Sequence, residues 1–312
     1  MENNQTIAIF GAGGFLGRHL LRKLTALDYR IKIGTRNPFQ KGYLKPLGNP
    51  GQIELFKTSI YNPDHIRQVI KNCDLVINLV GILHETKKQK FQDVHSNFPQ
   101  LLSNLCVEAG IRKFIHISAL GVKKNNKSKY MESKMQGEKN ILETLKSAVI
   151  LRPSVCFGYE DKFFNRFASL AQFSPMLPLI GGGKTKFAPV FVGDVSEAIV
   201  KSLTINNTNY KIYELGGPEI YSFKELMELL LLEIKKKRFL IPISFSLAKF
   251  YAYFIQMMPN PLLTVDQVEL LKENNIVSGD YSTLKDLGIN ATSISSILPK
   301  YIYRFRSGGQ FG

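Results

Sequence analysis

The sequence contains few of the residues that build disulfide frameworks or metal sites. Its three cysteines, Cys73, Cys106 and Cys156, lie far apart and form no C-x-x-C pair. A sparse, odd number of cysteines argues for a reducing compartment and against a disulfide framework or a zinc site. The five histidines show no H-E-x-x-H motif or comparable ligand spacing. We therefore expect no metal.

Long uncharged apolar runs are also missing, and no run approaches the roughly 20 residues that a membrane-spanning helix needs. The most apolar segment, residues 239–259, is interrupted by Pro242 and Lys249. We interpret this segment as a buried helix of a small lobe. The alternative is an interfacial helix, with the preceding K-K-K-R segment (235–238) meeting anionic lipid head groups.

The start of the chain leaves little room for a targeting segment. An apolar strand pattern begins within six residues of Met1. We therefore expect no signal or transit peptide, and function in the compartment of synthesis. This predicts a cytoplasmic protein, with a peripheral position on the inner face of the membrane as the alternative.

Acidic residues are scarce: 25 Asp and Glu face 41 Lys and Arg, which gives a net charge of +16 and a pI near 9.6. The simplest interpretation is a lysine-rich solvated surface. The functional alternatives are an anionic membrane surface or a polyanionic ligand. The sequence has no recognisable nucleic-acid reading motif and no interleaving of basic and aromatic residues. We therefore expect no nucleic-acid partner.

Strand-like and helix-like segments alternate through the first half of the chain. Strand patterns cover residues 6–12, 30–36, 74–81, 113–120 and 148–158, and helical patterns cover residues 15–27, 62–73, 98–110 and 130–146. This alternation implies right-handed βαβ units and a parallel sheet covered on both faces. We predict an α/β fold, with a doubly wound parallel Rossmann sheet in residues 1–155. Residues 156–312 are predicted to form a smaller C-terminal substrate lobe, partly interleaved with the sheet, in which 187–195 is a further strand.

A glycine-rich loop, F-G-A-G-G-F-L-G-R (10–18), lies between the first strand and the first helix. Gly11 permits a tight turn, Gly14 allows the backbone to approach a pyrophosphate, and Gly17 lets the helix pack on the strand. Gly11 and Gly13 also match the G-x-G beginning of the common dehydrogenase motif, whose last glycine would fall at Leu16. The loop predicts a dinucleotide site.

The second strand indicates which nicotinamide cofactor binds. An NAD site usually carries an acidic residue about 20 positions after the loop, to bind the ribose 2′-hydroxyl. No Asp or Glu occurs between Asp28 and Glu54, and the strand ends in Thr35 and Arg36. Arg36, together with Arg18, would pair with a 2′-phosphate instead. We therefore predict that NADP(H) is favoured over NAD(H).

A tyrosine and a lysine, Tyr130 and Lys134, stand one helical turn apart in Y-M-E-S-K. A phenol with a reference pKa of about 10 needs a nearby cation to work as an acid–base group at neutral pH. Lys134 is spaced to supply it. Ser118 ends a central strand, at the sheet edge where ligands bind in open α/β folds, and its hydroxyl is a candidate to orient a carbonyl.

These motifs, in this order, resemble the extended short-chain dehydrogenases/reductases. The segments N-L-V-G, L-R-P-S-V-C-F-G and F-V-G-D-V-S-E-A-I are also similar to that family, and the resemblance covers nearly the whole chain. It implies a catalytic tetrad of Asn97, Ser118, Tyr130 and Lys134. It also implies cofactor contacts at Gly11, Gly13, Gly14, Phe15, Leu16, Gly17, Arg18, Arg36, Ser59, Leu79, Val80, Gly81, Lys134 and Pro153. Where extended members usually place an Asp after the third strand, this chain has Thr58 and Ser59, either of which can hydrogen-bond the adenine end.

A narrower resemblance rests on V-I-N-L-V-G-I-L-H-E-T, E-A-G-I-R-K-F-I-H-I-S-A-L and N-P-L-L-T-V-D-Q-V-E-L-L-K-E-N-N. These segments are similar to the NDUFA9 group, atypical members named for the nucleotide-binding accessory subunit of respiratory complex I. The resemblance implies a bound NADPH and a peripheral place at a membrane complex.

Two kinds of function follow from the sequence. We expect an NAD(P)H-binding oxidoreductase that acts on a small hydrophobic carbonyl or quinone-type substrate near a membrane. The first alternative is a non-catalytic NADPH-binding accessory subunit of the NADH:ubiquinone oxidoreductase type, or a redox sensor, in contact with a membrane surface or a respiratory complex. The second alternative is a sugar-nucleotide epimerase or dehydratase.

Overall fold

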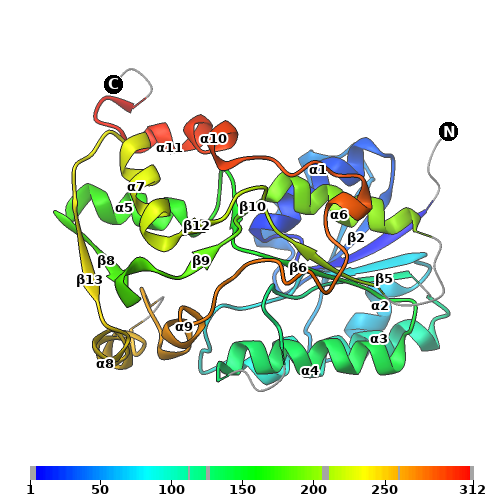
Figure 1. The fold of residues 1–312 in the computed structure, drawn as a ribbon. Coiled ribbons are helices and arrows are strands. Elements are labelled where there is room, and N and C mark those ends of the chain that lie inside the picture. The colour runs from blue at the N-terminus through cyan, green and yellow to red at the C-terminus, as the bar shows by residue number, and fades with distance from the viewer. Residues whose placement is uncertain (1–4, 112, 124–126, 206–210, 259–260, 310–312) are drawn as a thin grey trace.

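A parallel seven-stranded sheet forms the centre of the larger lobe (Figure 1). The computed structural model describes residues 5–309 except 112, 124–126, 206–210 and 259–260. The strand order is β11-β6-β5-β4-β1-β2-β3. The strands are β1 (Thr6–Phe10), β2 (Arg30–Thr35), β3 (Ile53–Lys57), β4 (Leu75–Asn78), β5 (Lys113–Ile117), β6 (Val149–Pro153) and β11 (Lys211–Leu215). This arrangement confirms the predicted doubly wound α/β fold.

Alternate side chains of each strand enter opposite layers of helices, as the pleat of a strand requires. Ile7 and Ile9 of β1 pack in one cluster with α1 and α6, whereas Ala8 and Phe10 pack in another with α2, α3 and α4. Figure 1 shows these two layers on either side of the sheet. The five helices are α1 (Phe15–Ala26), α2 (Pro63–Ile70), α3 (Phe98–Glu108), α4 (Lys129–Thr144) and α6 (Val192–Thr204).

The second lobe is built mostly from residues that follow β6 in the sequence. It has its own apolar core, which includes Phe157, Phe164, Leu226 and Leu230. Its strands are β7 (Cys156–Phe157), β8 (Met176–Ile180), β9 (Lys186–Phe187), β10 (Val190–Phe191), β12 (Tyr221–Ser222) and β13 (Phe239–Ile243), all in two-stranded pairs. Its helices are α5 (Phe164–Phe173), α7 (Phe223–Glu233), α8 (Phe245–Ile255), α9 (Val265–Leu270), α10 (Ile294–Ile297) and α11 (Pro299–Ile302). Short 3-10 turns are η1 (Phe39–Leu47), η3 (Gly181–Gly183), η4 (Lys285–Leu287) and η5 (Tyr303–Phe305), and η2 (Gln92–Asn97) is a π-helix.

The interpretation of residues 187–195 as one strand is wrong. Two short strands, β9 and β10, occupy its beginning, and α6 starts at Val192. Val192, Val195 and Ile199 are buried on one side of α6, a spacing of three and four residues that fits a helix lying on the sheet. The β-branched residues in this segment made it look strand-like.

The interpretation of residues 239–259 as a buried helix is also wrong. The segment forms the strand β13 and then α8, which begins after Ser244, whose hydroxyl accepts a hydrogen bond from the Leu247 amide. Only Ala248 and Ala252 of α8 are buried, because the apolar residues surround the helix and just one narrow side rests on the lobe. Pro259 lies outside the described residues. Within the described part of the chain, no helix is long and apolar enough to cross a membrane.

Candidate active site

The glycine loop is shaped by close backbone approach. Gly11 has φ +88, and a Cβ on it would lie 2.8 Å from the carbonyl carbon of Leu79. A Cβ on Gly17 would lie 2.3 Å from the carbonyl oxygen of Ala12. Gly14 precedes α1 without a side-chain cap, and the first turn of the helix has no acidic residue. The N–H groups of that turn therefore form a cradle that fits a dinucleotide pyrophosphate.

Two cations lie against this loop. The Arg18 guanidinium donates to the Gly13 carbonyl at 3.0 Å, and its Nε donates to the Glu160 carboxylate at 2.6 Å. Arg18 is thus engaged with Glu160 of the second lobe. Lys41, which we did not predict, lies over the loop: a Cβ on Gly13 would be 2.9 Å from the Lys41 Cε. Lys41 falls in the stretch between Asp28 and Glu54 that has no acidic residue, and this is the sequence signal that could have found it.

The ends of β2 and β3 hold the residues expected at the adenine ribose. Arg36 is exposed, makes no ion pair with any residue that the structure describes, and acts to lower the pKa of Tyr61, against a larger rise from burial. Ser59 accepts a hydrogen bond from the Tyr61 amide at 3.2 Å. Thr58 is buried and donates to the Phe56 carbonyl. Arg36 and Ser59 thus share a neighbour in Tyr61, and Arg36 is the cation left available to a ligand.

The loop after β4 is held by a side chain of β4 itself and by one from η2. The Asn78 side chain accepts from the Val80 amide at 3.0 Å, and His95 Nε2 accepts from the Ile82 amide at 3.0 Å. A Cβ on Gly81 would be 3.6 Å from Lys134 Nζ and 3.7 Å from His95 Nε2. The predicted Leu79–Gly81 segment therefore passes beside Lys134. The Pro153 carbonyl, at the end of β6, accepts from the Leu120 amide at 3.0 Å.

Lys134 is buried, 3% exposed, and its Nζ donates to the Ile117 carbonyl at 3.0 Å. Burial lowers the pKa of this ammonium to about 8, a shift that Glu138 opposes. One residue beyond Ile117, the Ser118 hydroxyl is buried and has no hydrogen-bond partner among the described residues. An unsatisfied buried hydroxyl at the carboxyl end of a central strand is suited to a ligand carbonyl, because burial without a partner costs free energy.

The Tyr130 ring packs edge-on against His95 and Phe91, with centroids 5.2 Å and 5.6 Å away. Burial raises the pKa of its phenol, and the Cys156 thiol and the Asp266 carboxylate raise it further. The expectation that Lys134 favours the phenolate is therefore corrected. Lys134 reaches the β5 backbone, and the charges that act on Tyr130 favour the protonated phenol.

Asn97 does not join the other predicted tetrad members. Its side chain is exposed, donates to Asp93 at 3.1 Å and accepts from Gln92 at 3.3 Å. The π-helix η2 turns the chain so that His95 points inward instead, with Nδ1 3.0 Å from the Ser133 hydroxyl. Burial, Lys134 and His116 lower the pKa of His95 to about 2, so the imidazole is neutral. The family resemblance that selected Asn97 takes this segment as an ordinary helix and does not register the π turn.

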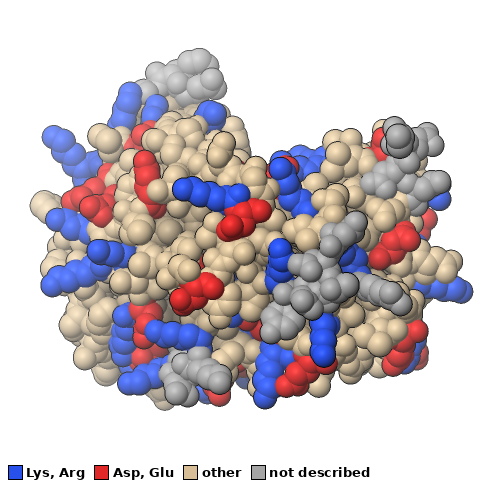
Figure 2. Space-filling model, turned by 45° about the vertical axis from the view of Figure 1, so that its right-hand side comes forward, with Lys and Arg blue, Asp and Glu red and all other residues tan. Residues whose placement is uncertain are grey.

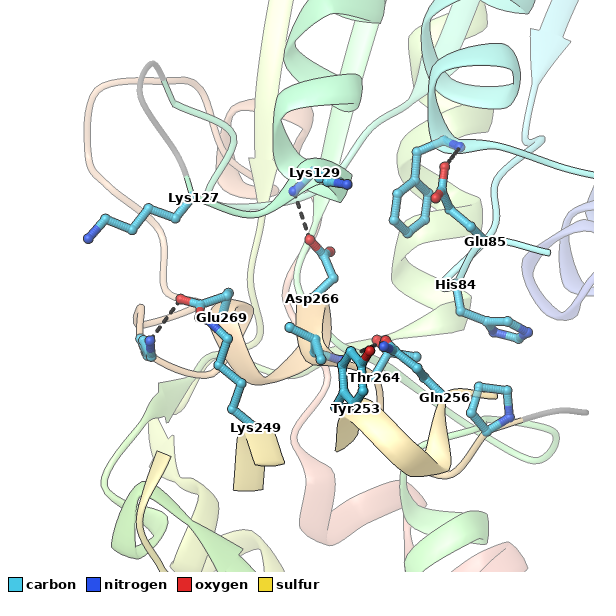
Figure 3. Close-up of a pocket in the computed structure, with 14 residues that line it drawn as sticks. His84, Glu85, Lys127, Lys129, Lys249, Tyr253, Gln256, Thr264, Asp266 and Glu269 are labelled. Carbon is cyan, nitrogen blue, oxygen red and sulfur yellow. Dashed lines mark hydrogen bonds and ion pairs between the residues drawn. The ribbon is translucent and has the colours of Figure 1, made fainter. Parts of the chain in front are cut away.

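A pocket of about 700 Å³ opens beside the N-terminus of α4 (Figure 3). Phe91, which contacts the Tyr130 ring, lines it, as does Asp266. Asp266 accepts hydrogen bonds from the Lys129 amide at 2.7 Å and the Ser128 hydroxyl at 2.8 Å, and so caps α4. Four lysines line the same pocket: Lys127, Lys129, Lys249 and Lys272. In the part of the chain that the structure describes, no group of three His, Cys, Asp or Glu residues could hold a metal ion.

Comparison with known proteins identifies the family. Residues 7–216 match the NAD dependent epimerase/dehydratase family. The chain belongs to this family. The structure of a dTDP-glucose 4,6-dehydratase from Streptomyces venezuelae with NAD bound has 17% sequence identity to this family member and a TM-score of 0.73, over 96% of each chain, which shows the shared nucleotide-binding Rossmann fold.

Relatives of this epimerase-family chain confirm the narrower resemblance too. It is 31% identical to the Arabidopsis thaliana mitochondrial "NADH dehydrogenase [ubiquinone] 1 alpha subcomplex subunit 9", over 96% of this chain and 78% of the relative. A "Ceramide reductase" of Caulobacter vibrioides is 27% identical over 62% of this chain and 59% of the relative.

Proposed function

We propose that this chain is an NADP(H)-binding reductase that acts on a hydrophobic carbonyl or quinone-type substrate near a membrane. The observation that carries the proposal is the buried Ser118 hydroxyl, which has no partner among the residues that the structure describes and lies one residue from the carbonyl that anchors Lys134. A folded chain retains such a group at a cost, and a substrate oxygen would satisfy it. A cytoplasmic location, peripheral on the inner face of the membrane, goes with this proposal.

The protonated state of the Tyr130 phenol suits it to act as a proton donor in reduction. A bound nicotinamide supplies the hydride in this chemistry. Because the pKa of Tyr130 is raised, its phenol keeps its proton at neutral pH and can give it to a developing alkoxide. Ser118 would hydrogen-bond the same oxygen and hold it in line with the phenol. Oxidation would instead need the phenolate, which burial and Asp266 disfavour.

The turnover test uses purified protein with NADPH and a panel of quinones and hydrophobic carbonyl compounds. We expect oxidation of NADPH with at least one compound, and its loss in Tyr130→Phe and Ser118→Ala. NADPH binding should survive both substitutions. Absence of turnover across the panel, together with wild-type behaviour of Tyr130→Phe in cells, would overturn the reductase proposal.

The preference for NADP(H) rests on Arg36, with Lys41 as the second cation near the loop. A guanidinium without an ion-pair partner at the end of β2 is suited to a 2′-phosphate. We expect Arg36→Ala to weaken NADPH binding at least tenfold and to leave NADH binding unchanged, measured by calorimetry. Arg30→Ala, at the opposite end of β2, is the matched control. Unchanged NADPH affinity in Arg36→Ala would show that the assignment is wrong.

The second candidate is a non-catalytic accessory subunit or redox sensor. It is favoured by Asn97, whose outward side chain leaves no amide to hold a water relay, and by His95, a neutral imidazole in the interior. The similarity to a complex I subunit supports a partner of that kind. A pull-down from solubilised membranes, with the bound nucleotide identified by mass, separates the two: a stoichiometric respiratory partner with no turnover favours the accessory role. Binding of a sugar nucleotide in the same assay would favour the epimerase or dehydratase alternative.

A further inference from the structure

Helix α8 presents most of its apolar side chains to solvent. It packs on the small lobe through Ala248 and Ala252, which meet Ile180 and Val268, and through the partly buried Phe245 at its start. Seven large apolar residues of α8 and the turn after it are between 46% and 69% exposed: Leu247, Phe250, Tyr251, Tyr253, Phe254, Met257 and Met258. Single exposed apolar residues are ordinary, whereas a contiguous group of this size marks an interaction surface.

The aromatic rings of α8 contact one another, and β13, which precedes the helix, adds further exposed apolar residues. Phe250 contacts Tyr251 and Phe254, and Tyr253 contacts Phe254, with ring centroids 5.3 to 5.9 Å apart. On β13, Phe239 and Ile241 point to the same side and are both exposed. β13 runs along the margin of the lobe and leads directly into α8 (Figure 1). We call this set, β13 with α8 and its following turn, the α8 surface.

Positive charge accompanies the α8 surface. The segment Lys235–Arg238 immediately precedes β13, and Lys249 lies on α8 itself, where it pairs with Glu269 at 2.9 Å. The whole chain carries +16. A second copy of the same chain is a poor occupant, because two such molecules repel each other. An apolar face rich in aromatic residues and flanked by lysines is instead typical of a helix that lies in the head-group region of an anionic bilayer.

The charge excess does not take the form of a uniform positive field. Figure 2 shows Lys and Arg side chains interspersed with Asp and Glu on the face it presents. Attraction between the net positive charge and an anionic bilayer therefore does not by itself select which face of the protein meets the lipid. The combination of exposed apolar residues and neighbouring lysines at the α8 surface selects that face.

We propose that the α8 surface docks onto the head-group region of an anionic lipid bilayer. This inference deepens the proposed function and rests on it, because the pocket is taken as the substrate pocket of the proposed reductase. Lys249, Tyr253 and Gln256 of α8 also line the pocket beside the N-terminus of α4 (Figure 3). Lys249 and Tyr253 thus belong to both the α8 surface and the pocket lining, so docking of this surface brings the pocket next to the bilayer.

The test is flotation of the full chain with lipid vesicles. We expect the wild type to float with vesicles of phosphatidylcholine containing phosphatidylglycerol, and much less with phosphatidylcholine alone. The double variant Phe250→Ser/Phe254→Ser should partition at least tenfold less. Phe39→Ser, which alters a phenylalanine that is 95% exposed on η1 in the other lobe, is the matched control and should float like the wild type. Raising the salt concentration should weaken binding, because salt screens the lysine contribution.

Three results would overturn the proposal. The first is equal flotation of the double variant and the wild type. The second is equal flotation on neutral and anionic vesicles. The third is no flotation of the wild type. A dimer that the double variant does not form, or a protein partner bound through this surface, would then be the occupant in place of lipid. Unchanged NADPH affinity in the double variant shows that it is folded, and separates failure of the docking proposal from failure of the nucleotide proposal.

Discussion

At the scale of single residues, the site combines an amine and a phenol, and burial disfavours the charged form of each. Lys134 has a pKa of about 8, and Tyr130 holds its proton more strongly than a free phenol. The pair was predictable from Y-M-E-S-K, because spacing alone brings the two residues to one helix face. The displacement of Asn97 by His95 was not, because it depends on the π turn at η2.

The lowered pKa of Lys134 predicts a pH dependence of stability. Between the folded value of about 8 and the reference value of 10.5, the unfolded chain binds more protons, so folding is favoured as the pH rises. We expect the free energy of unfolding of the wild type, relative to Lys134→Met, to rise by about 2 kcal/mol between pH 7 and pH 9.5. Urea unfolding at the two pH values measures this. Lys139→Met, an exposed lysine of the same helix, should show no such change relative to wild type, and parallel pH profiles for Lys134→Met and wild type would contradict the prediction.

At the scale of elements, the junction of β1 and α1 depends on the absence of a side chain at Gly17. A Cβ there would lie 2.3 Å from the Ala12 carbonyl oxygen, a contact that only a shift of the helix relieves. We expect Gly17→Ala to lower the free energy of unfolding by about 3 kcal/mol and to weaken NADPH binding. Gly42→Ala is the control, because a Cβ on Gly42 meets nothing within 4 Å. Similar melting temperatures for the two variants would show that the packing is looser than the structure indicates.

The elements also show where sequence patterns are sufficient. Hydrophobic periodicity predicts the strands of the sheet and the helices that cover it. Both faces of the sheet are buried, so the apolar positions in the sequence coincide with the buried positions in the structure. The pattern fails for α8, because nothing in the periodicity of an all-apolar segment says which side, if any, is covered. It fails for 187–195 because Val and Phe are equally at home in a strand and on the buried side of α6.

At the scale of the whole molecule, a buried ionic cluster connects the helical layer, the sheet and the C-terminal chain. Arg152 of β6 makes two hydrogen bonds to Glu138 of α4, at 2.9 and 2.6 Å, and lies 3.7 Å from Glu214 of β11. Glu214 in turn accepts from the Ser278 amide at 2.6 Å, and Tyr281 covers the guanidinium. This cluster was invisible in the sequence because its members are separated by up to 143 positions and only the fold brings them together.

Removing one member of that cluster should destabilise the whole fold. Glu138→Ala leaves the Arg152 charge buried with only the more distant Glu214 as a partner. We expect a loss of about 3 kcal/mol in the free energy of unfolding, measured by denaturant titration. Glu143→Ala removes half of the exposed Lys139–Glu143 pair on the same helix and should change stability little. Equal effects of the two substitutions would mean that burial does not strengthen the Arg152 pair.

The position of β11 also has a consequence for how the protein is made. β11 lies at the edge of the sheet, beside β6, although residues 154–210 separate the two strands in the chain, a stretch that holds α6 as well as the first elements of the second lobe. During synthesis, the nucleotide-binding half leaves the ribosome with its β6 edge unpaired and without α6 over one face. Such an edge pairs readily with other chains. The apolar residues beside it stay exposed to solvent until β11, which ends at residue 215, has left the ribosome. The first elements of the second lobe, β7 to β10, are therefore translated before the sheet is complete.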